Sequence, residues 1–452
     1  MKIIIVCCGK IGVSLISNLV SEGHDVVAID KDSETIAEVV NIYDVIGVCG
    51  MGTDCEVLEE AGIQRADLFV AVTGSDELNM LSCYIAKTLG AENTIARIRD
   101  RAYNENNLGF LQQQLGLSMS INPERYTAFD IYHVLKLPTA VHIETFSTRN
   151  FEIIEIVLKE NSPLHGIKIM DIRKQSPAKF LICAVEREDQ VYIPDGNFEL
   201  QSGDKIALTA APSEIIKLLR SLKITQKQAK SVMILGGSRT AYYLAKILLS
   251  GGSSVTIIDK DPVRCQELCD ALPGATVILG DGAQQELLLE EGLQDVDAFI
   301  SLTNIDEENI LISYYAQTLN VPKVITKVNR SEFVPMATRL GLDTVVSPRR
   351  TISDVIVRYA RALQNTVGSN VEKLYKIMDG NAEALMFNVH PEFKYVDIPL
   401  KDIRFKQNIL IAGILRNRKA IVPTGDDVIH PGDKVVIIST GHRLYDLADI
   451  IA

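Results

Sequence analysis

The sequence lacks the features that would tie it to nucleic acid or to a membrane. Its formal charge is −12 at pH 7 and it has no dense Lys/Arg run, so we expect neither a nucleic-acid partner nor a basic lipid-binding patch. No apolar run approaches the ~20 residues of a membrane-spanning helix, and "ILIAGIL" at 409–415 is among the longest. The first residues run at once into "IIIV" and a glycine turn, which predicts no signal peptide. We therefore expect a soluble globular protein of three or four domains.

Cysteine and histidine show no pattern of a metal or catalytic site. The eight cysteines lie mostly in apolar strand or helix patterns, which is typical of free cytoplasmic thiols. Cys265 and Cys269 stand four apart on an expected helix, but without a second ligand pair they do not predict zinc. The seven histidines form no grouping with Ser and Asp, and no Tyr–Lys pair is apparent. The proton donor that a dehydrogenase needs beside its cofactor is therefore not evident.

What the chain does have is a long internal repeat. Cys7 aligns with Gly236 and Asp30 with Asp259, at an offset of about 230 residues. The register continues to the "GDK" at Gly203, which matches that at Gly432. This period is far longer than a solenoid repeat, so the chain is a duplicated unit of many elements.

Each half begins with alternating strand and helix patterns. "KIIIV" (2–6) and "SVMIL" (231–235) are unbroken apolar runs, typical of parallel strands buried on both faces. Further strand patterns follow in the first half, and the second repeats their order: 25–30, 44–50, 66–73, 94–100 and 118–123. Six strands with helical crossovers predict an α/β fold in each half, a doubly wound, Rossmann-like parallel sheet.

The rest of each half has a different pattern. Short strands with turns end in a helical pattern, at 213–222 and at 442–451, which predicts a small α+β domain. The polar stretch 224–230 is the expected junction between the halves. We expect two Rossmann-like domains, at 1–123 and 230–348, each followed by a small α+β domain, at 140–224 and 370–452.

The turn after the first strand carries part of a dinucleotide-binding pattern. In G-x-G-x-x-G the first glycine makes the tight turn, the second admits the pyrophosphate, and the third packs the helix on the strand. Backbone N–H groups and the helix dipole then hold the phosphates. The first half reads Cys7, Gly9 and Gly12, so only the turn glycine is replaced.

The second half departs from the pattern at a different place. It keeps the turn glycine as Gly236 and has a tolerated Ala241 at the third position. Ser238, however, places a side chain where the pyrophosphate would press. We expect the first half to be the better nucleotide site. The second half fits better the alternative that the fold is retained only as a scaffold.

Charged residues end the second and fifth strands. Asp30 and Asp259 are expected to accept hydrogen bonds from adenosine ribose hydroxyls and to repel a 2′-phosphate, which favours NAD over NADP. Arg97 and Lys327 either reach a phosphate or remain solvated strand-end charges.

Polar residues also follow the fourth strands. Thr73 and Gly74, like Thr303 in the second half, lie at the carboxyl end of the sheet, where ligands bind. Asp76 and Asp306 are expected either to cap the following helix or to contact the ligand.

These stretches resemble the TrkA-type regulatory subunits of bacterial potassium uptake systems. The resemblance rests on "IIIVCCGKIG", "VVAIDKD", "GTDCEVLEEAGIQRADLFVAVTGSDELNM" and "IPDGNFELQSGDKIALTA", and on their copies in the second half. It covers essentially the whole chain. It implies two tandem RCK units, each with a Rossmann-like lobe and a TrkA-C lobe.

The resemblance also implies a function without catalysis. Such a protein is cytoplasmic and forms a ring, expected here to be a homotetramer, on the inner face of a TrkH-type membrane channel subunit. NAD(H), or ATP and ADP, especially in the second half, would shift the ring and gate potassium flow. The implied first site comprises Cys7, Cys8, Gly9, Lys10, Ile11, Gly12, Asp30, Thr73, Gly74 and Arg97. The implied second site comprises Gly236, Gly237, Ser238, Arg239, Asp259, Thr303 and Lys327. The alternatives are an NAD-dependent oxidoreductase and a nucleotide-free interaction scaffold.

Two amphipathic helices, at 126–138 and 352–364, bear on the expected self-association. Their apolar positions are Tyr126, Phe129, Ile131, Val134 and Leu135 in the first and Ile352, Val355, Ile356, Tyr359 and Leu363 in the second. Such faces need a covering surface. We expect another chain to supply it; the alternative is that both helices pack within their own chain.

Overall fold

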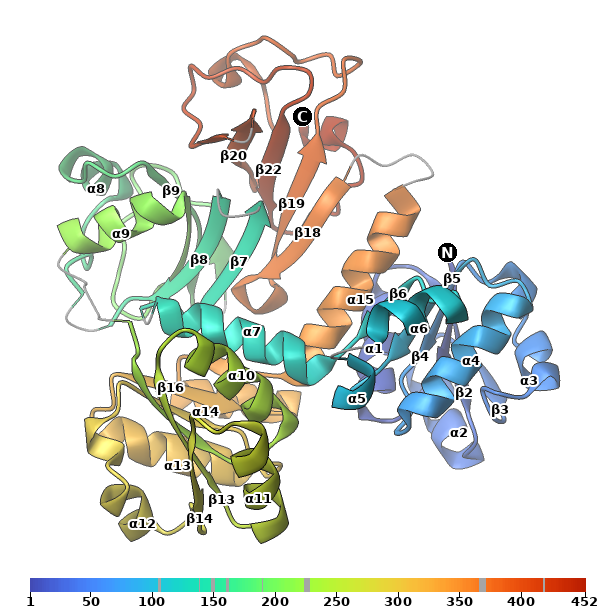
Figure 1. The fold of residues 1–452 in the computed structure, drawn as a ribbon. Helices are drawn as coiled ribbons and strands as arrows, with labels where there is room; N and C mark the ends of the chain where they lie inside the picture. Colours follow the sequence, from blue (N-terminus) through green and yellow to red (C-terminus); the bar gives the residue numbers. More distant parts are fainter. Residues whose placement is uncertain are drawn as a thin grey trace. The chain divides into compact units, whose positions relative to one another are not determined.

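The computed structural model describes residues 1–104, 107–137, 139–147, 151–159, 162–188, 190–222, 228–365, 371–417 and 419–452. It divides into two compact units (Figure 1). Unit 1 is Met1–Ala128 with Ser347–Arg361, and unit 2 is Phe129–Val346 with Ala362–Ala452. Residues 224–227 of the expected junction, the expected domain limits 224 and 370, and position 138 lie outside the described residues.

Unit 1 contains a six-stranded parallel sheet in the order β3-β2-β1-β4-β5-β6. Its strands are β1 (Lys2–Val6), β2 (Asp25–Asp30), β3 (Ile46–Cys49), β4 (Leu68–Ala71), β5 (Asn93–Arg97) and β6 (Met119–Ile121). Its crossover helices are α1 (Lys10–Ser21), α2 (Ser33–Ile42), α3 (Cys55–Glu60), α4 (Asp76–Thr88), α5 (Arg101–Asn104) and α6 (Leu108–Leu115). The strand order reverses beside β1, so the predicted doubly wound fold is confirmed. Ile3, Ile4 and Ile5 are fully buried, as a strand covered on both faces requires.

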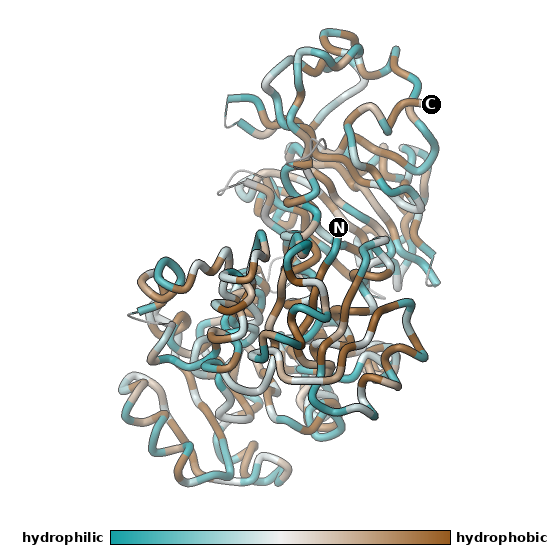
Figure 2. Tube along the Cα trace, turned by 90° about the vertical axis from the view of Figure 1, so that its right-hand side faces the viewer, coloured by the Kyte–Doolittle hydropathy of each residue, from teal (hydrophilic) through white to brown (hydrophobic). Residues whose placement is uncertain are grey.

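Unit 2 repeats this sheet in the order β14-β13-β12-β15-β16-β17. Its strands are β12 (Ser231–Leu235), β13 (Ser254–Asp259), β14 (Thr276–Leu279), β15 (Ala298–Ser301), β16 (Lys323–Lys327) and β17 (Val345–Val346). Its helices are α10 (Arg239–Ser250), α11 (Pro262–Ala271), α12 (Gln285–Glu290), α13 (Asp306–Thr318) and α14 (Val334–Arg339). The brown, hydrophobic runs in Figure 2 follow the strands of the sheets.

Unit 2 also holds both small domains, each built on a five-stranded antiparallel sheet. The first contains β7 (His142–Ser147), β8 (Phe151–Val157), α8 (Ile169–Gln175), β9 (Phe180–Arg187), β10 (Gln190–Tyr192), β11 (Lys205–Ala210) and α9 (Pro212–Ser221). The second contains β18 (Val371–Ile377), β19 (Ala382–Asn388), β20 (Ile409–Arg416), β21 (Lys419–Ile421) and β22 (Lys434–Ser439). One apolar cluster joins the two sheets, with Phe151 against Gly413, and Thr209 donates to the Ala412 carbonyl at 2.9 Å.

One expected element of the second small domain is largely absent. The helix predicted at 442–451 is only a 3₁₀ turn, Leu447–Ile450. The Asp449 carboxylate accepts from the backbone N–H groups of Tyr445 and Asp446, at 2.8 and 2.9 Å. Such local side-chain bonds compete with the helical pattern, so the turn does not extend into a helix.

Helix α15 (Pro348–Asn365) comes from the second half of the sequence but packs on the parallel sheet domain of the first half. Ser353 lies 2.6 Å from the Asn18 amide nitrogen, and Arg361 Nε donates to Glu22 at 2.7 Å. Ile352 and Ile356 of its apolar face are fully buried.

Helix α7 (Pro123–Lys136) provides the corresponding contact in unit 2, to which its residues from Phe129 onward belong. The Tyr132 hydroxyl lies against Gly251 at the end of α10. Ile131, Val134 and Leu135 are buried. The expectation that another chain must cover the two helices is therefore wrong for these positions, because the same chain covers them.

Within the described residues, no helix combines the length and the apolar character needed to cross a membrane.

Candidate functional site

The turn between β12 and α10 begins with a glycine that the geometry demands. Gly236 has φ +92°, and a Cβ on it would lie 2.8 Å from the Thr303 nitrogen. Gly237 follows, and Ser238 is the N-cap of α10, with its hydroxyl accepting from Ala241 N at 3.4 Å. The serine thus occupies an N–H group that a phosphate would otherwise bind. Arg239, the first residue of the helix, is exposed.

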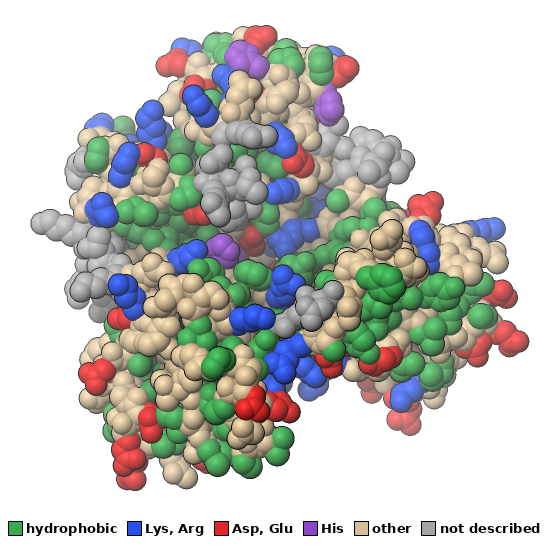
Figure 3. All heavy atoms as spheres, in the orientation of Figure 1, with side chains coloured by type: hydrophobic (Ala, Val, Ile, Leu, Met, Phe, Trp, Pro, Cys, Tyr) green, Lys and Arg blue, Asp and Glu red, His purple; other side chains and the backbone are tan. Residues whose placement is uncertain are grey.

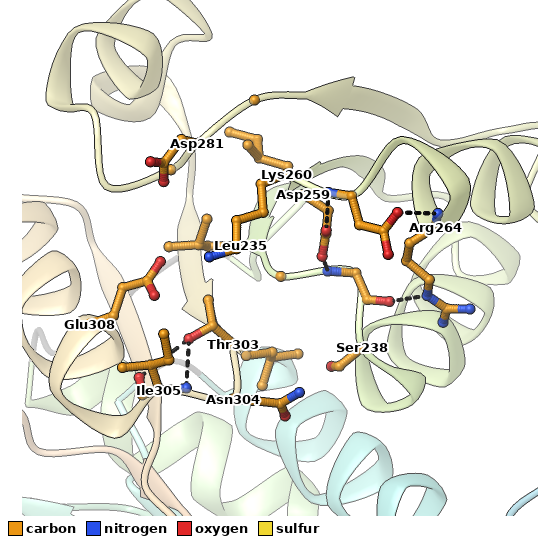
Figure 4. Close-up of a pocket in the computed structure, with 17 residues that line it drawn as sticks. Leu235, Ser238, Asp259, Lys260, Arg264, Asp281, Thr303, Asn304, Ile305 and Glu308 are labelled. Atoms are coloured by element: carbon orange, nitrogen blue, oxygen red, sulfur yellow. Dashed lines mark hydrogen bonds between the residues drawn. The ribbon is translucent and has the colours of Figure 1, made fainter.

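Asp259 closes this turn from the end of β13. Its carboxylate accepts from Gly237 N at 2.5 Å and from Asp261 N at 2.8 Å (Figure 4). The predicted proximity of acid and turn is present. A second role, holding the turn in shape, was not predicted.

A cavity of about 350 Å³ opens between the turn, β13 and the loop after β15. Asp281 and Glu308 line it on the side away from Arg264, whose Nε donates to the Gly237 carbonyl (Figure 4). The charged lining residues are Asp259, Lys260, Asp261, Arg264, Asp281 and Glu308, so carboxylates outnumber cations. The field in this cavity therefore favours a ligand of low negative charge.

The turn of the first half has the same backbone geometry but a different residue at its first position. Cys7 takes the left-handed conformation, with φ +80°, that glycine takes in the second half. A Cβ on Gly12 would lie 1.9 Å from the Cys7 carbonyl oxygen, so α1 approaches the turn as closely as glycine allows. Gly9 is the N-cap of α1 and has no side-chain cap. Lys10 and Ile11 follow in the first helical turn, and the N–H groups there remain available to an anion.

Asp30 holds this turn as Asp259 holds the other. Its carboxylate accepts from Cys8 N at 2.6 Å and from Asp32 N at 3.1 Å. Burial and the Asp30 charge raise the pKa of the Cys8 thiol to about 12, and burial also raises the pKa of Cys7. Neither cysteine is a reactive thiolate at neutral pH.

The basic residues that end the fifth strands turn inward. The Arg97 guanidinium donates to the Thr73 carbonyl, and Lys327 Nζ donates to the Thr303 carbonyl at 3.1 Å. Arg97 is only 8% exposed and Lys327 6%, so of the two alternatives the solvated strand-end charge is wrong. Burial lowers the pKa of Arg97, but the group remains a cation at neutral pH.

Sequence reasoning missed a buried asparagine that organises each of these strand ends. Asn79 Oδ1 accepts from Thr73 N at 2.8 Å, and its Nδ2 donates to the Arg97 carbonyl at 2.9 Å. Asn309 repeats both bonds with Thr303 and Lys327. Gly74 lies in the same loop, and its carbonyl oxygen accepts a hydrogen bond from the Arg99 guanidinium at 2.6 Å. The repeat itself was the available signal, because Asn79 aligns with Asn309.

Asp76 and Asp306 do not cap the helices that follow them. Asp76 accepts from the backbone N–H groups of Arg99 and Asp100, both at 2.7 Å. Asp306 likewise accepts from the N–H groups that follow β16. The cap of α4 is Ser75, which accepts from Leu78 N at 3.2 Å. The two aspartates therefore tie one βα loop to the next.

Among the residues that the structure describes, no group of three or more His, Cys, Asp or Glu side chains is placed to hold a metal ion.

The two doubly wound sheets, each with a tight turn before its first helix, and the two antiparallel domains define a duplicated Rossmann-like protein. Models of the TrkA-N domain match residues 3–123 and 232–348, and models of the TrkA-C domain match residues 153–223 and 385–452. The chain belongs to the TrkA family.

Curated relatives match it over nearly their whole length. Trk system potassium uptake protein TrkA homolog 1 of Methanosarcina mazei is 31% identical over 448 residues, 97% of each chain. The TrkA homolog of Archaeoglobus fulgidus is 30% identical over 452 residues, 100% of each chain. TrkA of Haemophilus influenzae is 30% identical over 443 residues, 97% of this chain and 95% of its own.

Solved structures share the fold at lower identity. The crystal structure of the GsuK RCK domain has a TM-score of 0.63 at 18% identity and covers 97% of this chain and 92% of its own. The GsuK channel bound to NAD has a TM-score of 0.62 at 19% identity and covers 97% and 77%.

Proposed function

We propose that the chain is a cytoplasmic, nucleotide-sensing regulatory subunit of a potassium uptake system and is not an enzyme. It binds NAD(H) and gates a TrkH-type membrane channel subunit through a ring of RCK units. The observation that carries this proposal is the repeated pairing of a strand-end aspartate with the N–H groups of an anion-binding turn. Membership of the TrkA family supports the potassium system as the context.

The residues of the first half fit a dinucleotide. A Cβ on Gly9 would meet only the Cys7 sulfur, at 3.5 Å, so the backbone there is open to close approach. The N–H groups from Gly9 to Gly12 would hold the pyrophosphate, with Arg97 supplying positive charge. Asp30 would bind the ribose hydroxyls and disfavour a 2′-phosphate.

The second half is the weaker or more selective site. Ser238 caps its helix, and the positions of Asp281 and Glu308 are held in the first half by the uncharged Met51 and Leu78. Gly236, Gly237, Arg239, Thr303 and Lys327 would complete this site. The candidate ligands here are NAD(H) and, besides it, ATP or ADP; the carboxylate-rich lining favours NAD(H), which carries the lower negative charge.

Self-association into a homotetrameric ring would use surfaces other than α7 and α15. Helix α4 exposes Leu81 by 48% and Tyr84 by 47%, and the aligned residues of α13, Leu311 and Tyr314, are exposed by 65% and 43%. Figure 3 shows hydrophobic side chains gathered over the face of unit 1 that carries α4 and α6. An apolar face repeated on both parallel sheet domains suits contacts between chains.

Light scattering during size exclusion tests this arrangement. We expect a mass near four times the 49.8 kDa chain, reduced by the double change Leu81→Asp and Leu311→Asp. Ile42→Asp, at the exposed end of α2, is the matched control. A concentration-independent mass of one chain would remove the ring.

Gating requires that the ligand bind the two ring states with different affinity. Mass spectrometry of the supernatant from denatured protein tests whether a nucleotide is retained, and recovery of NAD(H) supports the proposal. Turnover of a hydroxy acid or aldehyde would favour an NAD-dependent oxidoreductase. The absence of any thermal shift with NAD(H), ATP or ADP would favour a nucleotide-free scaffold.

A further inference from the structure

A buried lysine joins the parallel sheet of unit 2 to the first antiparallel domain. Lys323, the first residue of β16, is 6% exposed. Its Nζ donates to the Ala140 carbonyl at 2.7 Å and to Thr344 Oγ1 at 2.8 Å. Ala140 is fully buried and lies just before β7, so one side chain links two domains across 183 positions of sequence.

Both acceptors are uncharged oxygens, and their number equals the number of N–H donors on a neutral amine. A neutral amine has two N–H donors, and both are used here. An ammonium has three donors and a full charge. Within the described part of the chain, no carboxylate lies within ion-pairing distance of this nitrogen. Protonation would therefore bury a charge without a close partner, which is costly.

The charges around the joint agree with this geometry. Burial lowers the pKa of Lys323 to about 7, outweighing the attraction of Asp343, and Lys159 lowers it further. Burial raises the pKa of Asp343. His142, two residues beyond Ala140, titrates separately. Burial lowers its pKa, but its hydrogen bond to the Glu144 carboxylate and the charges of Glu144, Glu155 and Asp130 together raise that pKa to about 9.

The first half supplies a natural comparison at the aligned position. Asn93 stands there, and its amide oxygen accepts from Tyr359 of α15 at 3.3 Å and from Ser118 at 3.3 Å. This contact is made by groups that do not change charge near neutral pH. The titratable joint is therefore specific to unit 2.

We propose that Lys323 makes the docking of Ala140, just before β7, on β16 sensitive to pH, so that a rise above neutral tightens it and acidification loosens it. The sign follows from linkage, because the docked joint favours the neutral amine and an undocked, solvated lysine favours the ammonium. Above pH 7 the ratio of docked to undocked joint rises by up to about tenfold per pH unit. The device does not depend on which nucleotide binds.

Amide hydrogen exchange on the intact chain tests the proposal. The N–H groups of Ala140 and Val141 donate to the Leu137 and Glu155 carbonyls, beside the joint, and we expect them to exchange faster when Ala140 leaves Lys323. Between pH 7 and 8.5, after correction for the intrinsic exchange rate, we expect their protection to rise roughly tenfold in the wild type. Residues 93–97 of the first half, where Asn93 stands, should show no such rise.

Two variants separate Lys323 from other titrating groups. Lys323→Met cannot ionise and should lose the pH response, although His142 is retained. Lys323→Arg stays charged and should show low protection at both pH values. If the arginine variant does not fold, the comparison of wild type with methionine decides. An equal pH response in those two proteins, or no response in the wild type, would overturn the proposal.

Discussion

Replacing Ser238 with glycine should strengthen nucleotide binding in the second half of the chain. The serine hydroxyl accepts from Ala241 N at 3.4 Å, whereas Gly9 leaves the aligned N–H group of the first half without a side-chain cap. Ser238→Gly frees that N–H group and removes the side chain that faces the incoming phosphate. The second turn then carries the same backbone donors as the first.

The magnitude follows from one recovered hydrogen bond. A bond to a charged acceptor contributes about 1.5–3 kcal/mol, and about 1.4 kcal/mol is a factor of ten in affinity. We therefore expect the dissociation constant of the second site to fall about tenfold. Exchanging a serine cap for glycine costs only a few tenths of a kcal/mol. The melting temperature should accordingly change by less than about 2 °C.

Isothermal titration with ADP, combined with hydrogen exchange of residues 231–243, assigns the change to the second half. Ser238→Ala is the matched control, because it frees the N–H group but keeps a Cβ. Tightening in both variants would mean that the freed donor matters, and tightening in glycine alone would mean that close approach matters. Unchanged or weaker binding in Ser238→Gly would refute the assigned role of the cap.

Three further outcomes are expected. Asp30→Ala should weaken nucleotide binding at least about tenfold, and by more than Asp259→Ala does; titration calorimetry measures both losses. A larger loss of affinity in Asp259→Ala would reverse the ranking of the two sites. Gly12→Ala should lower the free energy of urea unfolding by about 1–3 kcal/mol, because its Cβ would meet the Cys7 carbonyl. An unchanged or higher unfolding free energy would mean that the first turn does not need glycine at this position. The free energy of unfolding of the wild type, measured relative to that of Lys323→Met, should rise by about 1.4 kcal/mol per pH unit above pH 7. The reason is that the folded-state pKa of the lysine is lowered, so the unfolded chain binds one more proton than the folded chain. Parallel pH profiles of the two proteins would contradict this.

The parallel sheets could be predicted from the sequence because their signals are local. An unbroken apolar run such as Ile3–Ile5 requires cover on both faces, and a glycine turn before a helix fixes the order of elements. The approach of Asp30 to its turn follows from the same geometry, because both lie at the carboxyl edge of neighbouring strands.

The contacts of α15 could not be predicted in the same way. Periodicity shows that Ile352 and Ile356 share a face, but it does not say which surface covers that face. Their partner is a domain more than two hundred residues earlier in the sequence. The burial of Lys323 has the same origin, because its acceptor Ala140 lies in another domain.

The inward turn of Arg97 depends on a side chain that sequence reasoning left without a role. Asn79 holds the Thr73 and Arg97 backbones together, and the guanidinium then caps the Thr73 carbonyl. A strand-end arginine pattern alone is compatible with a solvated charge, so the burial required knowledge of the neighbouring loop.

Titration calorimetry of the intact chain with NAD(H) and NADP(H), for the wild type and for Asp30→Asn, tests the nucleotide-sensing role most directly. The asparagine can still accept one of the two turn N–H groups, so the variant removes charge with little change in shape. We expect NAD(H) to bind at least about tenfold more tightly than NADP(H) in the wild type, and this preference to disappear in the variant. No binding of either cofactor, or equal affinity for both in the wild type, would contradict the proposed site.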